Sequence, residues 1–166
     1  MNRGNILRNN VFKKIRNTTP FHLGATSVQA IYLDDQMSGW QIYNNTFIDS
    51  HVGMFIGGGR DNKLVGNHCP STAFCVHVDN RGQNWMGHKG WEQNSYNINF
   101  APTATLLVGW QAMMKYPAWQ KAFPELKKIT DPCTPVGNVV TGNDYASGVF
   151  IDQPLSVTPT PRHSTP

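Results

Sequence analysis

Two aspartates, Asp34 and Asp79, each end a short apolar segment and could work as a catalytic pair. They follow Ile31-Tyr32-Leu33 and Val76-His77-Val78, and a third segment of this kind ends at Gly57. Paired carboxyl groups suit hydrolysis of a glycosidic bond, where one protonates the leaving oxygen and the other activates water. This chemistry requires a fold that brings both carboxyl groups to one surface.

The segments that end in these residues belong to an internal repeat. Asp34 to Gly57 spans 23 residues, and the steps from Gly57 to Asp79 and from Asn45 to Asn67 are 22. Units of this length with short strands bury their apolar faces only by stacking on one another. The leucine pattern of leucine-rich repeats is absent, so we expect an all-β solenoid, a parallel β-helix.

Aligned repeats predict which residues stack inside this solenoid. Side chains that alternate along the strands form apolar columns, and an asparagine column marks one corner, where amides can hydrogen-bond from one unit to the next. The apolar columns are Ile31, Met54, Val76 and Val149; Leu33, Ile56, Val78 and Ile151; Leu7, Ile42, Leu64 and Val140; and Phe12, Phe47, Cys69 and Tyr145. The asparagine column is Asn10, Asn45, Asn67 and Asn143.

The same alternation places the aspartates on the outer face. Asp34, Gly57, Asp79 and Asp152 then share one outward column. Parallel strands are ~4.8 Å apart, so Asp34 and Asp79 would be roughly 9–10 Å apart with a glycine between them. We expect Gly57 to leave a hollow for a sugar and a water, as in inverting glycosidases, whose carboxyl groups are ~6.5–9.5 Å apart.

Other side chains near this column are candidates for substrate binding. The residues expected to contact a substrate are Tyr32, Asp35, Arg60, His77, Arg81 and Trp85. Arginine can hold a carboxylate or hydroxyl groups, and tryptophan can stack on a sugar. Structural alternatives stay open: aspartate is a common corner residue, His77 can pack on Phe55, and the tryptophans can hold an insertion together. We expect no cofactor and no metal site, because His and Cys follow no ligand spacing; calcium at Asp34 and Asp35 is a weaker alternative.

The repeat is interrupted, which divides the chain into parts. We expect β-helix coils over 1–80, an insertion with short helices over 81–136, a final coil over 137–153 and a disordered tail over 154–166. Within the insertion, residues 116–129 predict one or two helical turns. Because the first repeat starts at its second strand, we expect a C-terminal fragment of a longer β-helix whose upstream coils are needed in cis.

Composition excludes several classes of partner. The chain has 166 residues and a net charge of +4 without a dense basic patch, so we expect no nucleic-acid partner; an acidic glycan would suit the mild positive charge. The chain contains no run of about 18 apolar residues, so we expect no membrane-spanning segment. The residues after Met1 do not form a signal peptide.

At least two of the three cysteines, Cys69, Cys75 and Cys133, are expected to be apolar core residues.

The motifs resemble the last coils of right-handed parallel β-helix proteins with a pectin lyase-like fold. The segments that carry the resemblance are 30–35, 53–62 and 76–82, together with Pro117, Trp119, Pro124-Glu125-Leu126 and Gly137-Asn138-Val139. They are similar to glycoside hydrolase family 141 and its relatives, over about residues 3–152. The resemblance implies a right-handed coil and a glycoside hydrolase; α-fucosidase and xylanase are known activities of the family.

These observations lead to one hypothesis and two alternatives. We expect a carbohydrate-active β-helix, a glycoside hydrolase or the remnant of one, with Asp34 and Asp79 as the pair and a glycan as substrate. The first alternative is a non-catalytic carbohydrate-binding or structural β-helix. The second is a polysaccharide lyase that uses Arg60 or Arg81 near calcium. The full-length form is expected to be secreted and extracellular.

Overall fold

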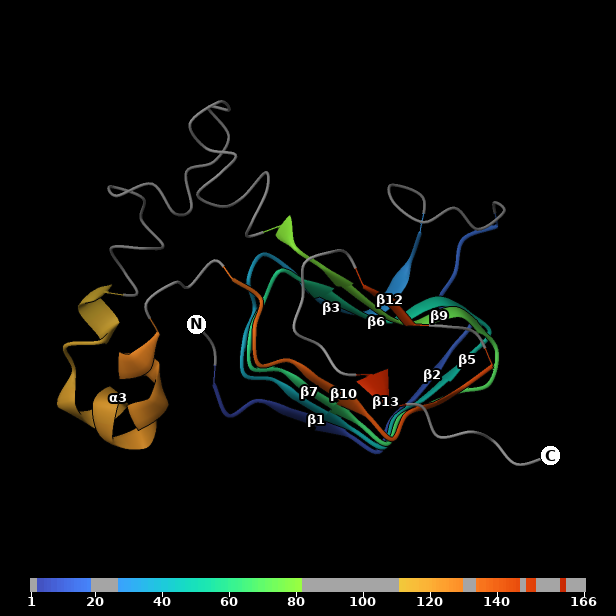
Figure 1. Ribbon diagram of the computed structural model, residues 1–166. Coiled ribbons are helices and arrows are strands. Elements are labelled where there is room, and N and C mark those ends of the chain that lie inside the picture. The colour runs from blue at the N-terminus through green and yellow to red at the C-terminus, as the bar shows by residue number, and fades with distance from the viewer. Residues whose placement is uncertain are drawn as a thin grey trace, which may run out of the picture.

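The strands of this protein form three parallel sheets. The computed structural model describes residues 3–18, 27–81, 111–129, 134–146, 149–151 and 159–160 (Figure 1). Sheet A has the order β1 (Ile6–Arg8), β4 (Gln41–Tyr43), β7 (Lys63–Val65), β10 (Val139–Thr141) and β13 (Pro159–Thr160). Sheet B has the order β11 (Asp144–Tyr145), β8 (His68–Cys69), β5 (Thr46–Ile48) and β2 (Val11–Lys13). Sheet C has the order β12 (Val149–Ile151), β9 (Thr72–Asp79), β6 (Ser50–Gly57) and β3 (Gln29–Leu33). The expectation of an all-β protein is confirmed for these residues.

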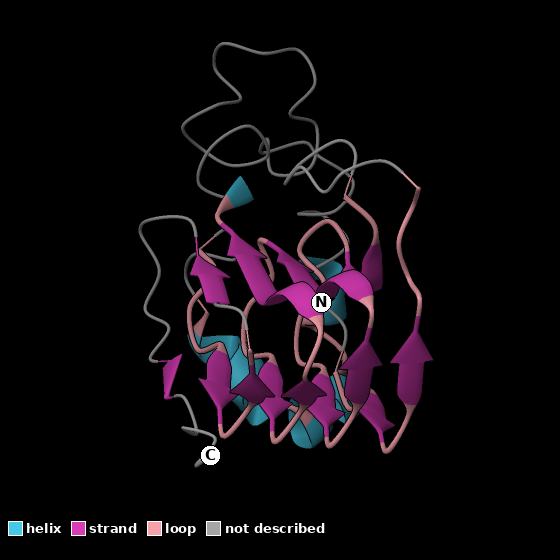
Figure 2. Ribbon diagram, turned by 90° about the vertical axis from the view of Figure 1, so that its right-hand side faces the viewer, coloured by secondary structure: helices cyan, strands magenta, loops and turns pink. Residues whose placement is uncertain are grey.

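Along the first twelve strands, each strand pairs with the strand three places away in the sequence. The chain passes from sheet A to B to C and returns to A, so it builds four layers: β1–β3, β4–β6, β7–β9 and β10–β12. Sheets A and C lie opposite each other, and sheet B lies at one side between them (Figure 1). Figure 2 shows strands of successive layers side by side. Between the second and third layers, residues 22 apart therefore become neighbours.

The predicted apolar columns are confirmed by the strand register. Ile31 pairs with Met54, Met54 with Val76, and Val149 with Val76. Leu7 likewise pairs with Ile42. The apolar-column side chains of the two middle layers are completely buried, and removing their apolar surface from water is the main stabilising contribution to such a core.

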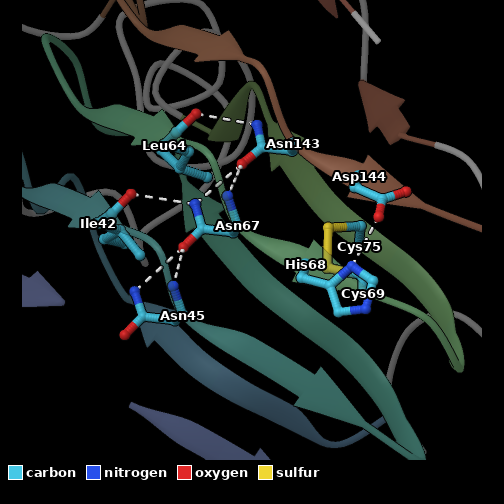
Figure 3. Close-up of a disulfide and its surroundings, with 9 residues drawn as sticks. All are labelled: Ile42, Asn45, Leu64, Asn67, His68, Cys69, Cys75, Asn143 and Asp144. Carbon is cyan, nitrogen blue, oxygen red and sulfur yellow. Dashed lines mark hydrogen bonds and ion pairs between the residues drawn. A yellow bond between two sulfur atoms is a disulfide. The ribbon is translucent and has the colours of Figure 1, made fainter. Parts of the chain in front are cut away.

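The asparagine column is also confirmed, and it forms a continuous hydrogen-bonded ladder, of which Figure 3 shows Asn45, Asn67 and Asn143. Asn45 Oδ1 accepts from Asn10, Asn67 Oδ1 from Asn45, and Asn143 Oδ1 from Asn67, each time from both the backbone N–H and Nδ2 at 2.9–3.1 Å. We call these four residues the asparagine ladder. Buried amides need such partners, because an unsatisfied polar group is costly in a core.

The left-handed corner lies one residue before the ladder, not on it. Asn9, Asn44, Gly66 and Gly142 have φ between 51° and 67°. Only glycine and, less readily, asparagine adopt this conformation at low cost. The corner and the ladder therefore use neighbouring residues, one for backbone geometry and the other for hydrogen bonding.

A second asparagine pair at the corner between sheets C and A escaped the sequence analysis. Asn62 Oδ1 accepts from the backbone N–H of Trp40, and Asn138 Oδ1 accepts from the backbone N–H and Nδ2 of Asn62. Both asparagines lie five residues before a ladder asparagine, and this constant offset could have revealed them.

Cys69 and Cys75 are completely buried, as expected, but they form a disulfide rather than two separate core thiols (Figure 3). The bond joins β8 to β9 within one layer. Cys69 belongs to a predicted inward column, but Cys75 belongs to none, so the columns did not indicate this pairing. Cys133 lies outside the described residues.

Two short helical segments occupy the predicted stretch 116–129: α3 (Pro117–Ala122) and the 3₁₀ helix η2 (Pro124–Lys128). Each starts with a proline, whose fixed φ suits a first helical position. Leu126 of η2 is buried. The proposed insertion boundaries remain a prediction, because residues 82–110 and 130–133 are outside the described residues, as is the tail apart from β13.

Candidate functional site

Asp34 and Asp79 lie in one column at the end of sheet C, as the sequence predicted. Leu33 pairs with Ile56, and Gly57 pairs with Asp79. Asp34 directly follows Leu33, so Asp34, Gly57 and Asp79 end three neighbouring strands. The two carboxyl groups therefore share one wall of the molecule.

The space over Gly57 is filled by the guanidinium group of Arg81. Nη1 donates to Asp34 Oδ1 at 2.7 Å and to Asp35 Oδ1 at 3.1 Å, while Nη2 donates to Asp79 Oδ2 at 2.7 Å. A Cβ at Gly57 would lie 2.7 Å from Cζ of Arg81. The prediction that Gly57 leaves a hollow for a sugar is therefore wrong. The missing side chain instead makes room for an arginine of the same chain.

We call Tyr32, Asp34, Asp35, Asp79 and Arg81 the Arg81 cluster. Only 7% of the Arg81 side chain is exposed, whereas Asp34 and Asp35 are about half exposed, at 52% and 50%. Tyr32 is 45% exposed, and its hydroxyl oxygen accepts from Nη1 and Nη2 at 3.2 Å. The arginine is thus the interior of the cluster, and two carboxylates and a phenol ring form its outer surface.

An aromatic column supports the cluster. The rings of Tyr32 and Phe55 meet edge to face at 4.7 Å, and those of Phe55 and His77 at 4.6 Å. Arg81 lies 5.2 Å from the centre of the Phe55 ring, within the range of a cation–π contact. His77 is buried against Phe55, so the geometry favours the structural alternative for this residue. Phe55 is a part of the site that the sequence analysis did not assign to it.

The charges of the cluster shift its acid–base equilibria. Burial by itself would raise the pKa of Asp34, but the hydrogen bond from Tyr32 and the charge of Arg81 outweigh it and lower this pKa. Burial raises the pKa of Tyr32, against the opposing effect of Arg81. Burial likewise opposes ionisation of Arg81, but the hydrogen bond and charge of Asp79 raise the pKa of Arg81. Asp34 is therefore ionised at neutral pH and Arg81 is positively charged.

The backbone that carries Asp35 is unusual. Asp35 and the next residue, Gln36, both have positive φ, 39° and 67°, in a turn closed by a hydrogen bond from the Met37 N–H to the Asp34 carbonyl at 3.0 Å. Such turns normally carry glycine or asparagine at these positions. Two residues with side chains are kept here in a strained conformation, and one of them contributes a carboxylate to the cluster.

Two predicted site residues, Arg60 and Trp85, are not among those that the structure assigns to the cluster. The Nε of Arg60 donates to Asp61 Oδ2 at 3.1 Å, at the corner that leads into sheet A. Trp85 and Asp152 lie outside the described residues. The structure thus brings together six of the eight candidates: Tyr32, Asp34, Asp35, His77, Asp79 and Arg81.

The cluster limits which of the two aspartates could act as the general acid. A general acid must be protonated before the reaction, whereas Asp34 is held in its ionised form by Tyr32 and Arg81. Asp79 accepts hydrogen bonds from Nε and Nη2 of Arg81 at 2.9 and 2.7 Å. An arginine with a raised pKa is also a poor base, which disfavours the lyase alternative.

No group of three or more His, Cys, Asp or Glu side chains in the described part of the chain is arranged to hold a metal ion. In the same residues, every helix is too short or too polar to cross a bilayer. We also compared the chain with protein-family models, with curated proteins and with solved structures, and none of the three comparisons found a match.

Proposed function

We infer that this protein is a right-handed parallel β-helix that binds a glycan on the Arg81 cluster. The recurrence of three parallel sheets over four layers supports the β-helix part of the proposal. The resemblance of its corner motifs to family 141 glycoside hydrolases supports both the handedness and the carbohydrate ligand.

The observation that carries the binding proposal is the Arg81 clamp. Carboxylate oxygens accept hydrogen bonds from hydroxyl groups, and the clamp fixes Asp34 and Asp35 beside the exposed Tyr32 before any ligand arrives. Preorganised groups lose less conformational freedom on binding, so they contribute more to affinity. A phenol ring beside two acceptors matches a sugar, which has a weakly polar face and a rim of hydroxyl groups.

The charge of the cluster narrows the class of sugar. Three carboxylates surround one guanidinium, so the cluster carries two net negative charges at neutral pH. This arrangement repels uronates, in contrast to the weakly positive charge of the whole chain. Neutral and amino sugars are the ligands that it favours.

Calorimetric titration of the full chain with neutral, amino and uronic oligosaccharides tests this proposal. Tyr32→Ala should weaken binding of the best ligand at least tenfold, a change of about 1.4 kcal/mol. Tyr116→Ala is the matched control, because Tyr116 is also exposed, at 62%, but lies beside α3. Equal affinity of both variants, or no binding to any neutral or amino sugar, would contradict the proposal.

Asp35→Gly separates a binding role from a structural one. Glycine relieves the strained backbone at φ 39°, so we expect the free energy of unfolding to be unchanged or higher by up to about 1 kcal/mol. The same substitution removes a hydroxyl acceptor, so affinity should fall. A large loss of stability would mean that Asp35 mainly stabilises the fold.

Glycoside hydrolysis remains the second candidate function, because Asp34 and Asp79 share one wall. It requires a substrate that displaces Arg81 and restores a protonated carboxyl group. The test is release of reducing ends from oligosaccharides that bind. Activity that disappears in Asp34→Asn and in Asp79→Asn, with binding retained, would support hydrolysis over simple binding.

A further inference from the structure

A three-residue motif lies at the corner between sheets A and B in the second layer. Asn44-Asn45-Thr46 has the spacing Asn-x-Thr, which is the acceptor for N-linked glycosylation when the middle residue is not proline. The motif joins the end of β4 to the start of β5. Such motifs are common by chance, so the argument for a glycan depends on how the fold presents the three residues.

The corner exposes Asn44 and buries Asn45. Asn44 is exposed and has φ 51°, whereas Asn45 is completely buried in the asparagine ladder. Thr46 is partly exposed on the outer face of sheet B, because it alternates with the buried Phe47 along β5. The asparagine that would accept the glycan and the hydroxyl that defines the motif therefore both lie at the surface, which is where a bulky glycan can be accommodated.

The amide of Asn44 is turned with its oxygen toward the next layer. A Cβ added at Gly66 would lie 2.7 Å from Asn44 Oδ1 and 3.9 Å from its Cγ, and Nδ2 is not within 4 Å. In the described part of the chain, Nδ2 of Asn44 donates no hydrogen bond that a glycan would break. By contrast, Nδ2 of Asn45 donates to Asn67 Oδ1 and to the Leu7 carbonyl. Of the two adjacent asparagines, only Asn44 can therefore be substituted without loss of a hydrogen bond of the ladder.

The disulfide between Cys69 and Cys75 is an independent observation that points to the same compartment as the motif. Disulfides form and persist in oxidising compartments, the secretory lumen among them, and they are rare in the cytosol. N-linked glycans are attached to proteins that enter the secretory route. A compartment in which this disulfide forms is thus also one in which Asn44 meets the enzyme that transfers the glycan.

We propose that Asn44 is an N-glycosylation site, which is occupied when the chain enters the secretory compartment. Nδ2 of Asn44 attacks the anomeric carbon of an oligosaccharide that is linked to a lipid diphosphate. The bond between Nδ2 and this carbon forms, and the bond from the carbon to the diphosphate oxygen breaks. A base of the transferase takes one proton from Nδ2, and the lipid diphosphate leaves.

Secretion of the full chain from cultured animal cells, behind a cleavable secretion signal, tests the proposal. Peptide N-glycosidase in heavy-oxygen water converts a glycosylated asparagine into labelled aspartate, so mass spectrometry of peptides identifies the site. We expect the label at Asn44 in most of the secreted molecules. Secreted, folded protein in which Asn44 is unmodified would overturn the proposal. Asn17→Gln in every chain removes a second motif, 17–19, which ends outside the described residues.

Matched variants separate the motif from the fold. Thr46→Val should abolish the label at Asn44, and Thr46→Ser, which keeps the hydroxyl, should retain it. Asn44→Gly should also abolish it and should fold as well as the wild type, because Gly66 and Gly142 occupy the same left-handed corner in other layers. Urea denaturation of the secreted variants confirms that they fold. A label that persists in Thr46→Val would show that the motif is not what directs the modification.

The first layer offers a test in the opposite direction. Asn9 occupies the same corner as Asn44, is exposed and has φ 59°, and Val11 pairs with Thr46. Val11→Thr therefore gives Asn9 the motif spacing, at a position that is 68% exposed. We expect a second labelled site, at Asn9. If Asn9 stays unmodified while Asn44 is modified, presentation by this corner does not explain the modification, and the structural argument fails.

Discussion

The asparagine ladder and the Arg81 cluster both extend across several layers, but they differ in charge, in burial and in whether their residues repeat. The ladder is neutral and, apart from Asn10, buried, and it repeats one residue type at one corner. The cluster is charged and partly exposed, and it gathers residues that do not repeat around a single arginine. The comparison indicates that repetition serves stability in this molecule, and that departure from repetition marks the surface for which we propose binding.

Asn67→Ala should give the largest loss of stability, because Asn67 lies in the middle of the ladder. The substitution leaves the backbone N–H and Nδ2 of Asn45 and the carbonyl of Ile42 without their buried partner. We expect the free energy of unfolding to fall by about 3 kcal/mol. Urea denaturation measures this change, and Asn10→Ala at the exposed end is the control, with a loss of roughly 1 kcal/mol. Equal losses would show that the ladder does not depend on burial.

Arg81→Met should have the next largest effect. It keeps most of the apolar stem but leaves Asp34, Asp35 and Asp79 without their cation. We expect a loss of about 2 kcal/mol in the free energy of unfolding, below the full penalty for a buried pair because two carboxylates are half exposed. Added salt should recover part of this loss, since it screens the repulsion. No loss would mean that the cluster adds little stability.

Acid should weaken the cluster before it weakens the ladder. The pKa of Asp34 is lower in the folded than in the unfolded chain, so its stabilising contribution is present above the usual aspartate pKa of about 3.9 and is lost as pH falls through the lower folded pKa. Denaturation between pH 6 and pH 3 should therefore show a smaller acid-induced loss for Asp34→Asn than for the wild type. Asn67→Ala should keep the wild-type slope, because asparagine does not titrate.

Arg16→Ala should have the smallest effect and serves as a reference for surface charge. Arg16 Nε and Asp49 Oδ1 are 2.9 Å apart, but the side chains are 50% and 41% exposed. Exposed pairs of this kind contribute about 0.5 kcal/mol or less. If Arg16→Ala lowers the urea midpoint as much as Arg81→Met does, the Arg81 cluster contributes no more to the free energy of unfolding than an ordinary surface ion pair.

The fold was largely predictable, because repetition makes a short pattern specific. The offsets of 22 and 23 residues aligned Ile31 with Met54 and Asn45 with Asn67, and the strand register and the ladder confirm both alignments. The second pair, Asn62 and Asn138, follows from the same repeat, because each lies five residues before a ladder asparagine. The disulfide between Cys69 and Cys75 was missed because an odd number of cysteines did not point to a pairing.

The candidate site was predictable in its placement but not in its packing. Alternation along the strands placed Asp34 and Asp79 on one wall. It could not show that Arg81, two residues beyond β9, folds back over Gly57, because this position depends on the turn after the strand and on attraction to three carboxylates. Arg60, which has a similar place after β6, pairs with the adjacent Asp61 instead.

The disulfide has a mechanical consequence. It closes a loop inside one layer and does not connect that layer to the next. A force that pulls the two termini apart would therefore peel the layers one after another, with no covalent clamp to stop it. Only the segment between Cys69 and Cys75 would stay folded back. This would shorten the fully stretched chain by about 15 Å, because six residues span roughly 20 Å when extended and the disulfide keeps the two Cα atoms 5.5 Å apart.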